Sequence, residues 1–324
     1  VGSPNSFNNE IGVPHTLFLA DESTETLVVE IGTNAPGEIA ALCRIANPTG
    51  AIITNIGAAH LEGLGTKEGV AQEKGDLVEK LSSEGFCVLN ANCPFTPQIS
   101  SRTSARVITF SVEGDGDLDA TDLYTHGAGT TFRLDGREVT SPLVGAHNVE
   151  NLLAALAACR GMGMDLDEVL PMVSGVKAAR GRMERIELDD LVILDDSYNA
   201  NPTSAMASVR VLEGMHGHER RVLVLGEMLE LGEHSDPAHK AIGADAAARK
   251  VDLLLCVGEL AQATAAGALE EGLPSESELH YETAQDLVEN CEGLFQPGDV
   301  ILVKGSRGVG LERLVQHLSA IYGE

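Results

Sequence analysis

Short apolar runs alternate with stretches of helical periodicity through the second half of the chain. The apolar runs cover 191–194, 222–225, 252–257 and 300–303. The helical stretches cover 203–212, 239–249, 260–270, 284–294 and 311–321. Strands without polar alternation fit a sheet that is covered on both faces, and their alternation with helices of about 10–15 residues indicates parallel βαβ units. The pattern therefore predicts a doubly wound, Rossmann-like α/β domain in this half.

The first half of the chain is also α/β, but its pattern is less regular. Buried strands are predicted at 27–31, 51–54 and 86–90, and helices at 66–81 and 149–160. These elements predict a second α/β domain. The length of 324 residues agrees with this division, since about 150 residues per domain is usual.

Between residues 106 and 144 the pattern changes to short strands with many polar residues. Asp135-Gly136 lies between two such strands, which is a strong signal for a two-residue β-hairpin. We therefore predict a β-rich subdomain within the first domain. The basic, glycine-bearing stretch Gly175–Arg182 is the predicted hinge and domain limit, which gives domains at 1–180 and 181–324.

The charge balance excludes several classes of partner. Acidic residues outnumber basic ones by 49 to 22, for a net charge of −27. Such a chain lacks the cationic surface for nonspecific nucleic-acid binding, and anionic membranes repel it. Its longest apolar runs are far shorter than the ~20 residues of a membrane span, so no membrane insertion is expected. A small anionic ligand is not excluded, because a few local cations or N–H groups can bind a phosphate.

The six cysteines are scattered and include no C-x-x-C pair. Most lie in apolar strand-like or helix-like stretches, so we expect buried thiols rather than disulfides or metal ligands. This pattern favours a reducing, cytoplasmic compartment.

Polar side chains stand at the ends of three apolar runs. Glu30, Asp195-Asp196 and Lys304 each follow such a run directly. Ligands of open α/β sheets bind beyond the carboxyl ends of the strands. Polar residues can simply mark the exit of a strand, but three such positions in one chain favour a ligand site.

Other polar residues have an ordinary structural interpretation beside a functional one. A lone histidine such as His60 is usually structural, although a carboxylate nearby, such as Glu30, would make the pair suitable for a divalent cation. Lys74 has the pattern of a solvated helix lysine. Asn148 and Asn151 share one helix face and could either cap the helix or bind a purine edge.

The stretch Asp195–Pro202 is the most unusual of the chain, because it has more polar and turn-forming residues than a turn requires. It belongs to a series of short motifs that resembles the Mur ligase family along the whole chain. In the first half the motifs are 8–14 (NNEIGVP), 30–34 (EIGTN), 37–39 (GEI), 60–63 (HLEG) with Gly65, Lys74-Gly75, and His147-Asn148 with Asn151. In the second half they are Gly181-Arg182, 195–201 (DDSYNAN), 230–232 (ELG) and 304–307 (KGSR).

The resemblance implies an ATP-dependent amide synthesis, in which a carboxylate becomes an acyl phosphate and an amine then displaces phosphate. The DSYNAN and KGSR motifs resemble those of members that join D-alanyl-D-alanine to UDP-N-acetylmuramoyl tripeptide in peptidoglycan synthesis. ATP and Mg²⁺ are the implied cofactors, these two peptides are the implied partners, and we expect a monomer.

The resemblance also implies roles for individual residues. Glu30, His60 and Lys74 would be catalytic and would hold Mg²⁺, Lys74 after carbamylation by CO₂, which needs a neutral amine and hence a depressed pKa. Nucleotide binding is implied for Asn9, Asn148, Asn151, Arg182 and Asp196. Binding of the dipeptide and of the peptide end of the other substrate is implied for Tyr198, Asn199, Asn201, Lys304, Ser306 and Arg307.

Two features of the family do not occur in the sequence. One is the phosphate-binding loop G-x-x-x-x-G-K-[ST]; the stretch 63–67 (GLGTK) has its letters in the wrong order and is interpreted as a helix N-terminus, and Gly305–Gly310 is only a weak approximation to the different motif G-x-G-x-x-G. The other is the N-terminal domain that holds the UDP end of the substrate. We therefore expect a partial central ATPase-type domain and a complete C-terminal domain. We also expect a protein of this sequence to turn over little substrate in the ligation reaction. The alternatives are another Mur or folylpolyglutamate-type ligase, or a noncatalytic ligand-binding fragment.

Overall fold

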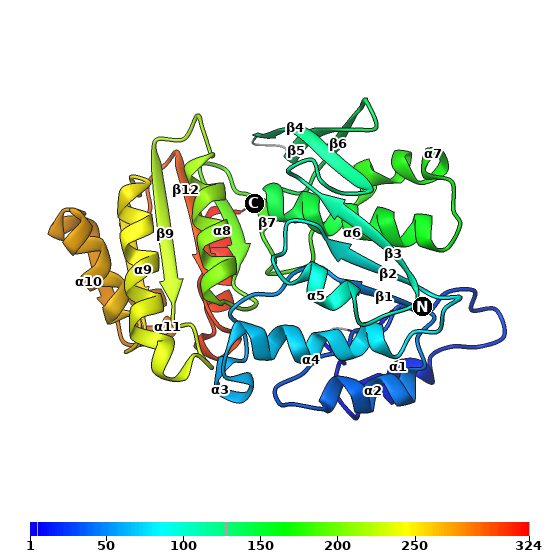
Figure 1. The fold of residues 1–324 in the computed structure, drawn as a ribbon. Coiled ribbons are helices and arrows are strands. Elements are labelled where there is room, and N and C mark those ends of the chain that lie inside the picture. The colour runs from blue at the N-terminus through cyan, green and yellow to red at the C-terminus, as the bar shows by residue number, and fades with distance from the viewer. Residues whose placement is uncertain (5, 127–128, 324) are drawn as a thin grey trace. The chain divides into compact units, whose positions relative to one another are not determined.

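The computed structural model describes residues 1–4, 6–126 and 129–323 (Figure 1). Its contacts divide the chain into two compact units. The first unit comprises 1–121 and 150–171, and the second unit comprises 122–149 and 172–324. The domain limit at residue 180 stays a prediction.

Parallel strands form the centre of the first unit. The strands β1 (Gly50–Ile53), β2 (Phe86–Asn90) and β3 (Arg106–Ser111) pair in parallel in that order, and the first residues of β4 (Leu118–His126) pair in parallel with β3. The strands predicted at 51–54 and 86–90 are thereby confirmed.

Helix α4 (Lys67–Glu79) packs on this sheet through one apolar face. Val70 and Val78 lie in one cluster with alternate residues of β1 and β2. The helix begins after Thr66, whose hydroxyl accepts the N–H of Gly69 at 3.1 Å, and this confirms the helix predicted over 66–81. The other helices with residues in this unit are α1 (Gly12–Leu17), α2 (Glu38–Ala46), α3 (Leu61–Leu64), α5 (Thr96–Ser100), α6 (Ala146–Gly161), α7 (Leu166–Val169) and the start of η1 (Leu170–Gly175).

The strand predicted at 27–31 is wrong. The structure has only an isolated parallel bridge there, between Val28 and Gly2, and Val28 is 62% exposed. An apolar run becomes a buried strand only where a sheet pairs with it and other elements cover it. None of the strands in the described part of the chain pairs with this segment. Its composition alone therefore gave a misleading signal.

The β-rich stretch continues into the second unit. There β5 (Gly129–Leu134) and β6 (Arg137–Ser141) form an antiparallel hairpin. Asp135 and Gly136 connect them, with φ values of 49° and 78°. Two central residues of positive φ are what a type I′ hairpin turn requires, so the predicted hairpin is confirmed. The strand order of this sheet is β1-β2-β3-β4-β5-β6.

A second sheet, of order β11-β10-β9-β12-β8-β7, lies entirely in the second unit. All its neighbours pair in parallel except the edge strand β7, which is antiparallel to β8. The strands are β7 (Glu184–Glu187), β8 (Val192–Asp196), β9 (Arg220–Gly226), β10 (Leu253–Val257), β11 (Glu278–Tyr281) and β12 (Asp299–Lys304). The four predicted apolar strands are confirmed as β8, β9, β10 and β12. The edge strands were not predicted, because they are half exposed and correspondingly polar.

Helices cover both faces of this second sheet, as a doubly wound fold requires (Figure 1). Leu194 and Leu223 lie in one apolar cluster with α8, α9 and α10, whereas Ile193 and Val222 lie in another with α11 and α12. The bounds are α8 (Pro202–Glu213), α9 (Ser235–Ala248), α10 (Gln262–Glu271), α11 (Ala284–Glu289) and α12 (Glu312–Tyr322), with short 3₁₀ turns η2 (Gly232–His234), η3 (Ser275–Ser277) and η4 (Arg307–Val309). The predicted fold class is confirmed, and α11 is shorter than the predicted 284–294.

All six cysteines are free thiols and five of them are buried, in agreement with the prediction. Within the described ranges, the chain has no helix whose length and apolar character would let it cross a bilayer.

Candidate active site

The carboxyl edge of the second sheet brings together side chains that lie far apart in the sequence. Strands β8 and β12 are parallel neighbours, in a register that sets Asp196 beside Lys304. The helix that follows β8 packs on one face of the sheet and the helix that follows β12 packs on the other. Such a change of face is where open α/β sheets bind their ligands.

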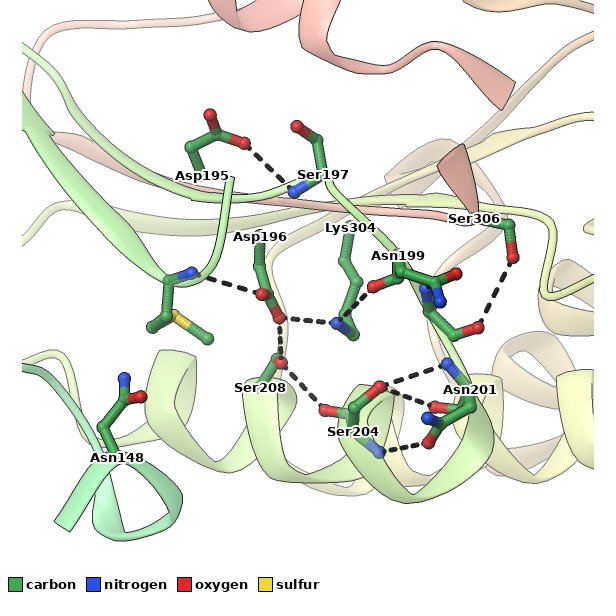
Figure 2. Close-up of polar contacts among 12 residues, drawn as sticks. Asn148, Asp195, Asp196, Ser197, Asn199, Asn201, Ser204, Ser208, Lys304 and Ser306 are labelled. Carbon is green, nitrogen blue, oxygen red and sulfur yellow. Dashed lines mark hydrogen bonds and ion pairs between the residues drawn. The ribbon is translucent and has the colours of Figure 1, made fainter. Parts of the chain in front are cut away.

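Lys304 is held inside this edge by two oxygen atoms. Its Nζ lies 2.6 Å from Oδ2 of Asp196 and donates to the carbonyl oxygen of Asn199 at 3.0 Å (Figure 2). Only 2% of the residue is exposed. A buried ammonium group needs such partners, because its removal from water is costly. Three residues that the sequence assigned to a site are therefore in direct contact.

Asp196 has further partners that sequence reasoning missed. Its Oδ2 also accepts from the Ser208 hydroxyl at 2.6 Å, and its Oδ1 accepts from the N–H of Met183 at 3.2 Å (Figure 2). The adjacent Asp195 is buried and accepts instead from the N–H of Ser197 at 3.0 Å. Successive residues of a strand point to opposite faces, so only one acid of the pair reaches Lys304 on β12.

The loop after β8 is fixed by its own polar side chains. Oδ1 of Asn201 accepts the N–H of Ser204 at 2.9 Å, and Oγ of Ser204 accepts the N–H of Asn201 at 3.1 Å, which forms a capping box at the start of α8. Oγ of Ser306 accepts the N–H of Leu229 at 2.9 Å and donates to the Ala200 carbonyl at 3.4 Å. The structure thus gives Asn201 and Ser306 a role in shaping the loop.

Two arginine side chains lie against the Tyr198 ring at the same edge. The guanidinium carbon of Arg182 lies 4.4 Å from the centroid of the Tyr198 ring, and that of Arg307 lies 5.5 Å from it. Both distances are within the range of cation–π attraction. The backbone N–H of Tyr198 donates to the Gly181 carbonyl at 3.0 Å. This hydrogen bond fixes the backbone that carries the ring, two residues after the end of β8.

Asn148 lies at the start of α6, in the part of the chain that belongs to the second unit, and its Nδ2 donates to the Val144 carbonyl at 3.0 Å. The neighbouring His147 has its pKa lowered, chiefly by burial, while the charge of Asp196 acts in the opposite direction. Asn151 is one helical turn further along and falls in the first unit.

In the first unit, the predicted metal ligand Glu30 is exposed, and one of its carboxylate oxygens accepts from Nδ2 of Asn8 at 2.8 Å. The predicted Asn9 has a structural role here. Its Oδ1 accepts from the N–H groups of Ile11 and Gly12 at 3.2 and 2.9 Å, at the start of α1. Asn8 is therefore the side chain that meets Glu30.

His60 precedes α3 in a left-handed backbone conformation, with φ of 56°. Few residues other than glycine adopt this conformation, and such outliers are frequent at functional sites. His60 also interacts electrostatically with Glu38: the pKa of Glu38 is lowered, first by the hydrogen bond from the Asn34 N–H and to a lesser extent by the charge of His60. This acidic partner was not predicted.

Lys74 lies on α4 and is partly buried, and burial lowers its pKa. This is the direction that carbamylation requires. The preceding Glu73 is 4% exposed, and its carboxylate accepts from the N–H groups of Gly37 and Ile39 at 2.7 and 2.8 Å. It thereby fixes the start of α2. Sequence reasoning missed Glu73, although its helical spacing from the buried Val70 places a charge on the apolar face of α4.

The described residues contain no group of three or more His, Cys, Asp or Glu side chains placed to hold a metal ion. The predicted set of Glu30, His60 and Lys74 contains only two side chains of these four types. Its third member, Lys74, would offer a carboxylate only after carbamylation. The metal ligands and the other predicted site residues remain predictions.

Comparison with known proteins identifies the two halves of the chain. Residues 1–159 match the Mur ligase middle domain, and residues 181–307 match the family described as Mur ligase, glutamate ligase domain. The UDP-N-acetylmuramoyl-tripeptide–D-alanyl-D-alanine ligase of Bacillus subtilis (strain 168) is 36% identical over 316 residues, covering 97% of this chain and 68% of the relative. The ligase of the same name from Escherichia coli (strain K12) is 37% identical, covering 97% and 69%.

Solved structures agree. MurF from Acinetobacter baumannii has a TM-score of 0.89 and 30% identity, with 98% of this chain and 70% of that chain covered. MurF ligase from Thermotoga maritima in complex with ADP has a TM-score of 0.86 and 25% identity, with 99% and 73% covered. From these matches over both halves, the chain belongs to the Mur ligase family.

Proposed function

We propose that this chain is an ATP-dependent ligase that joins D-alanyl-D-alanine to UDP-N-acetylmuramoyl tripeptide. The observation that carries the proposal is the 36% identity, over 97% of the chain, to a ligase of that name. The chemistry requires ATP, because a carboxylate does not acylate an amine at neutral pH. The fold supports the proposal with polar groups gathered at the carboxyl edge of the second sheet.

In the proposed reaction a carboxylate oxygen of the tripeptide attacks the γ-phosphorus of ATP, and the bond from that phosphorus to the β–γ bridging oxygen breaks. ADP leaves and an acyl phosphate forms. The amine of D-alanyl-D-alanine then attacks the acyl carbon, loses a proton, and expels inorganic phosphate. Both steps concentrate negative charge, which placed cations and N–H groups stabilise.

We assign nucleotide binding to Asn9, Asn148, Asn151, Arg182 and Asp196. Arg182 is exposed and forms no ion pair within the described ranges, so its guanidinium is available to a phosphate. Asp196 acts on the nucleotide indirectly, because its two carboxylate oxygens already accept from Lys304, Ser208 and the Met183 N–H. We therefore infer that Asp196 positions Lys304.

We assign the peptide substrates to Tyr198, Asn199, Asn201, Lys304, Ser306 and Arg307. Asn199 supports this assignment, because its carbonyl binds Lys304 while the residue itself is exposed at the sheet edge. Lys304 is then a buried positive charge at this edge, and Arg307 is an exposed one.

We assign Mg²⁺ binding to Glu30, His60 and Lys74. The donor chemistry fits: Glu30 is an exposed carboxylate, His60 has a constrained backbone, and the lowered pKa of Lys74 favours the neutral amine that reacts with CO₂. When bound, Mg²⁺ would neutralise the charge of the transferring phosphoryl group. The Asn8 amide on Glu30 would orient that carboxylate.

The proposed compartment is the cytoplasm, and the proposed oligomeric state is a monomer. Six unpaired thiols fit a reducing compartment. Sedimentation of the purified protein tests the oligomeric state.

The proposed activity is tested with protein expressed from the complete gene, supplied with ATP, Mg²⁺, UDP-N-acetylmuramoyl tripeptide and D-alanyl-D-alanine. The expected result is equimolar release of phosphate and formation of the pentapeptide product, seen by mass spectrometry. Replacement of the dipeptide by single amino acids should abolish the product. Ligation of a single amino acid instead would identify another ligase of the family, and binding without phosphate release would identify a noncatalytic module.

The proposed carbamate is tested in the same assay with Lys74→Ala. Loss of turnover is expected, because the metal site loses a carboxylate. Lys80→Ala, at the exposed end of the same helix, is the control and should remain active. Full activity of Lys74→Ala would exclude the carbamate.

A further inference from the structure

The segment that follows β9 holds the loop after β12 from two sides. The Glu227 carbonyl accepts the N–H of Ser306 at 2.9 Å, and the N–H of Leu229 donates to the Ser306 hydroxyl at 2.9 Å. These two hydrogen bonds come from the residues on either side of Met228. Residues 227–229 therefore grip both the backbone and the side chain of Ser306, and we call them the 227–229 clamp.

The ends of β9 and β12 approach each other closely beside the clamp. A Cβ on Gly226 would lie 3.4 Å from Cα of Gly305, and a Cβ on Gly305 would lie 3.2 Å from Cα of Gly226. Backbone thus packs directly on backbone, which glycine permits. Ser306 is also the residue from which η4 begins, with Arg307 as its first member. The position of the clamp therefore decides where the chain enters η4.

A buried histidine holds the middle of the clamp. The N–H of Met228 donates to Nε2 of His239 at 2.9 Å, and both residues are fully buried. Because Nε2 accepts this hydrogen bond, the ring proton lies on Nδ1, which donates to the Ser235 carbonyl at 2.8 Å. Ser235 is the first residue of α9. One neutral tautomer of His239 thus links the clamp to the start of this helix.

The clamp needs this acceptor more than the apolar core does. Without it the Met228 N–H would be a buried donor that lacks a partner, which shifts an equilibrium by a factor of about 10 to 100. The smallest adjustment that relieves the donor is a movement of residues 227–229, and Ser306 would move with them. An apolar side chain could fill the same space on α9, but it could not hold the clamp.

We propose that His239 is a positioning residue for the ligation reaction, because through the 227–229 clamp it fixes Ser306 and the start of η4. This inference rests on the proposed function, which assigns Ser306 and Arg307 to the peptide substrates. His239 is fully buried and acts only through the clamp. Loss of its hydrogen bond to Met228 should raise the KM for the peptide substrates. The KM for ATP should not change, because the clamp bonds to Ser306.

Two amide variants separate the two hydrogen bonds of the ring. His239→Gln carries its amide at the level of Nε2 and can accept the Met228 N–H. His239→Asn carries its amide at the level of Nδ1 and can reach only the Ser235 carbonyl. Both variants lose the ring and bury an amide, so a merely structural role predicts similar effects for the two.

Kinetics are measured on protein expressed from the complete gene, with ATP, Mg²⁺, UDP-N-acetylmuramoyl tripeptide and D-alanyl-D-alanine. For His239→Gln we expect KM values close to those of the wild type. For His239→Asn we expect the KM of at least one peptide substrate to rise about tenfold. Ser306→Ala should raise the same KM, and the double variant His239→Asn/Ser306→Ala should add little, because both changes break one clamp.

Hydrogen exchange observes the clamp without the reaction. In His239→Asn the amides of Met228, Leu229 and Ser306 should exchange about tenfold faster than in the wild type, whereas His239→Gln should protect them. Ile242→Val is the stability control, because Ile242 is a fully buried apolar residue of the same helix. It should leave both the three amides and the KM values unchanged.

Equal KM values for His239→Asn and His239→Gln would overturn the proposal. So would an equal rise in the KM for ATP, or activities that follow the free energy of unfolding through all the variants, Ile242→Val included. Unchanged exchange of the three amides in His239→Asn would overturn it as well. If the wild type forms no product, the proposed function fails, and the exchange rates alone decide whether His239 holds the clamp.

Discussion

Replacement of Lys304 by methionine tests the account of the carboxyl edge most directly. The change removes the positive charge and keeps most of the side-chain volume. It leaves Asp196, whose side chain is 14% exposed, with the Ser208 hydroxyl and one backbone N–H as its remaining partners. Breaking a buried ion pair costs about 3–5 kcal/mol. Because two of the donors to Asp196 remain, we expect the low end of that range, a loss of about 3 kcal/mol in the free energy of unfolding.

The assay is urea unfolding followed by circular dichroism, with hydrogen exchange to show that β8 and β12 lose protection. Lys240→Met is the control, because Lys240 pairs with Glu270 on the surface, where the two side chains are 50% and 63% exposed. That pair should contribute less than about 1 kcal/mol. The double variant Lys304→Met/Asp196→Asn should be more stable than the sum of the single losses predicts. Additive losses, or a loss for Lys304→Met no larger than the control's, would refute the reasoning.

Three further predictions concern other buried groups. Glu73→Ala should lower the free energy of unfolding by about 2 kcal/mol, because two backbone N–H groups lose their acceptor. Burial lowers the pKa of His239 below its ordinary 6.5, and its Nε2 accepts the Met228 N–H at 2.9 Å, so its contribution to stability should be complete above pH 6.5 and decline as the pH falls below it. Gly243→Ala should cost about 3 kcal/mol, because a Cβ there would lie 1.9 Å from the Thr264 carbonyl oxygen.

Each of these has its own control. Glu68→Ala, on the exposed first turn of α4, is the control for Glu73→Ala and should leave the free energy of unfolding unchanged. The pH effect is measured as the difference in the free energy of unfolding between the wild type and His239→Gln. A difference that stays constant between pH 7 and pH 5 would contradict the prediction. Ala241→Ser, on the exposed side of α9, is the control for Gly243→Ala, and equal thermal midpoints would show that the α9–α10 contact can relax.

The local pattern of the sequence was sufficient for much of the fold. The strands β8, β9, β10 and β12 are apolar throughout because they are buried on both faces, and this leaves a strong signal in the composition. The Asp135-Gly136 hairpin was equally clear, because few residue pairs adopt two positive φ angles. The run at 27–31 was misread because burial depends on partners outside it.

The sequence by itself determined the family and the residue types of the site, since these lie in short motifs whose order is visible along the chain. It did not determine which atoms meet. The parallel register of β8 and β12 decided that Lys304 lies against Asp196, across 108 positions of sequence. The packing of α4 on α2 likewise decided that Glu73 is buried beneath the start of α2. These contacts depend on the pairing and packing of distant segments, which no local pattern encodes, so only the tertiary structure could decide them.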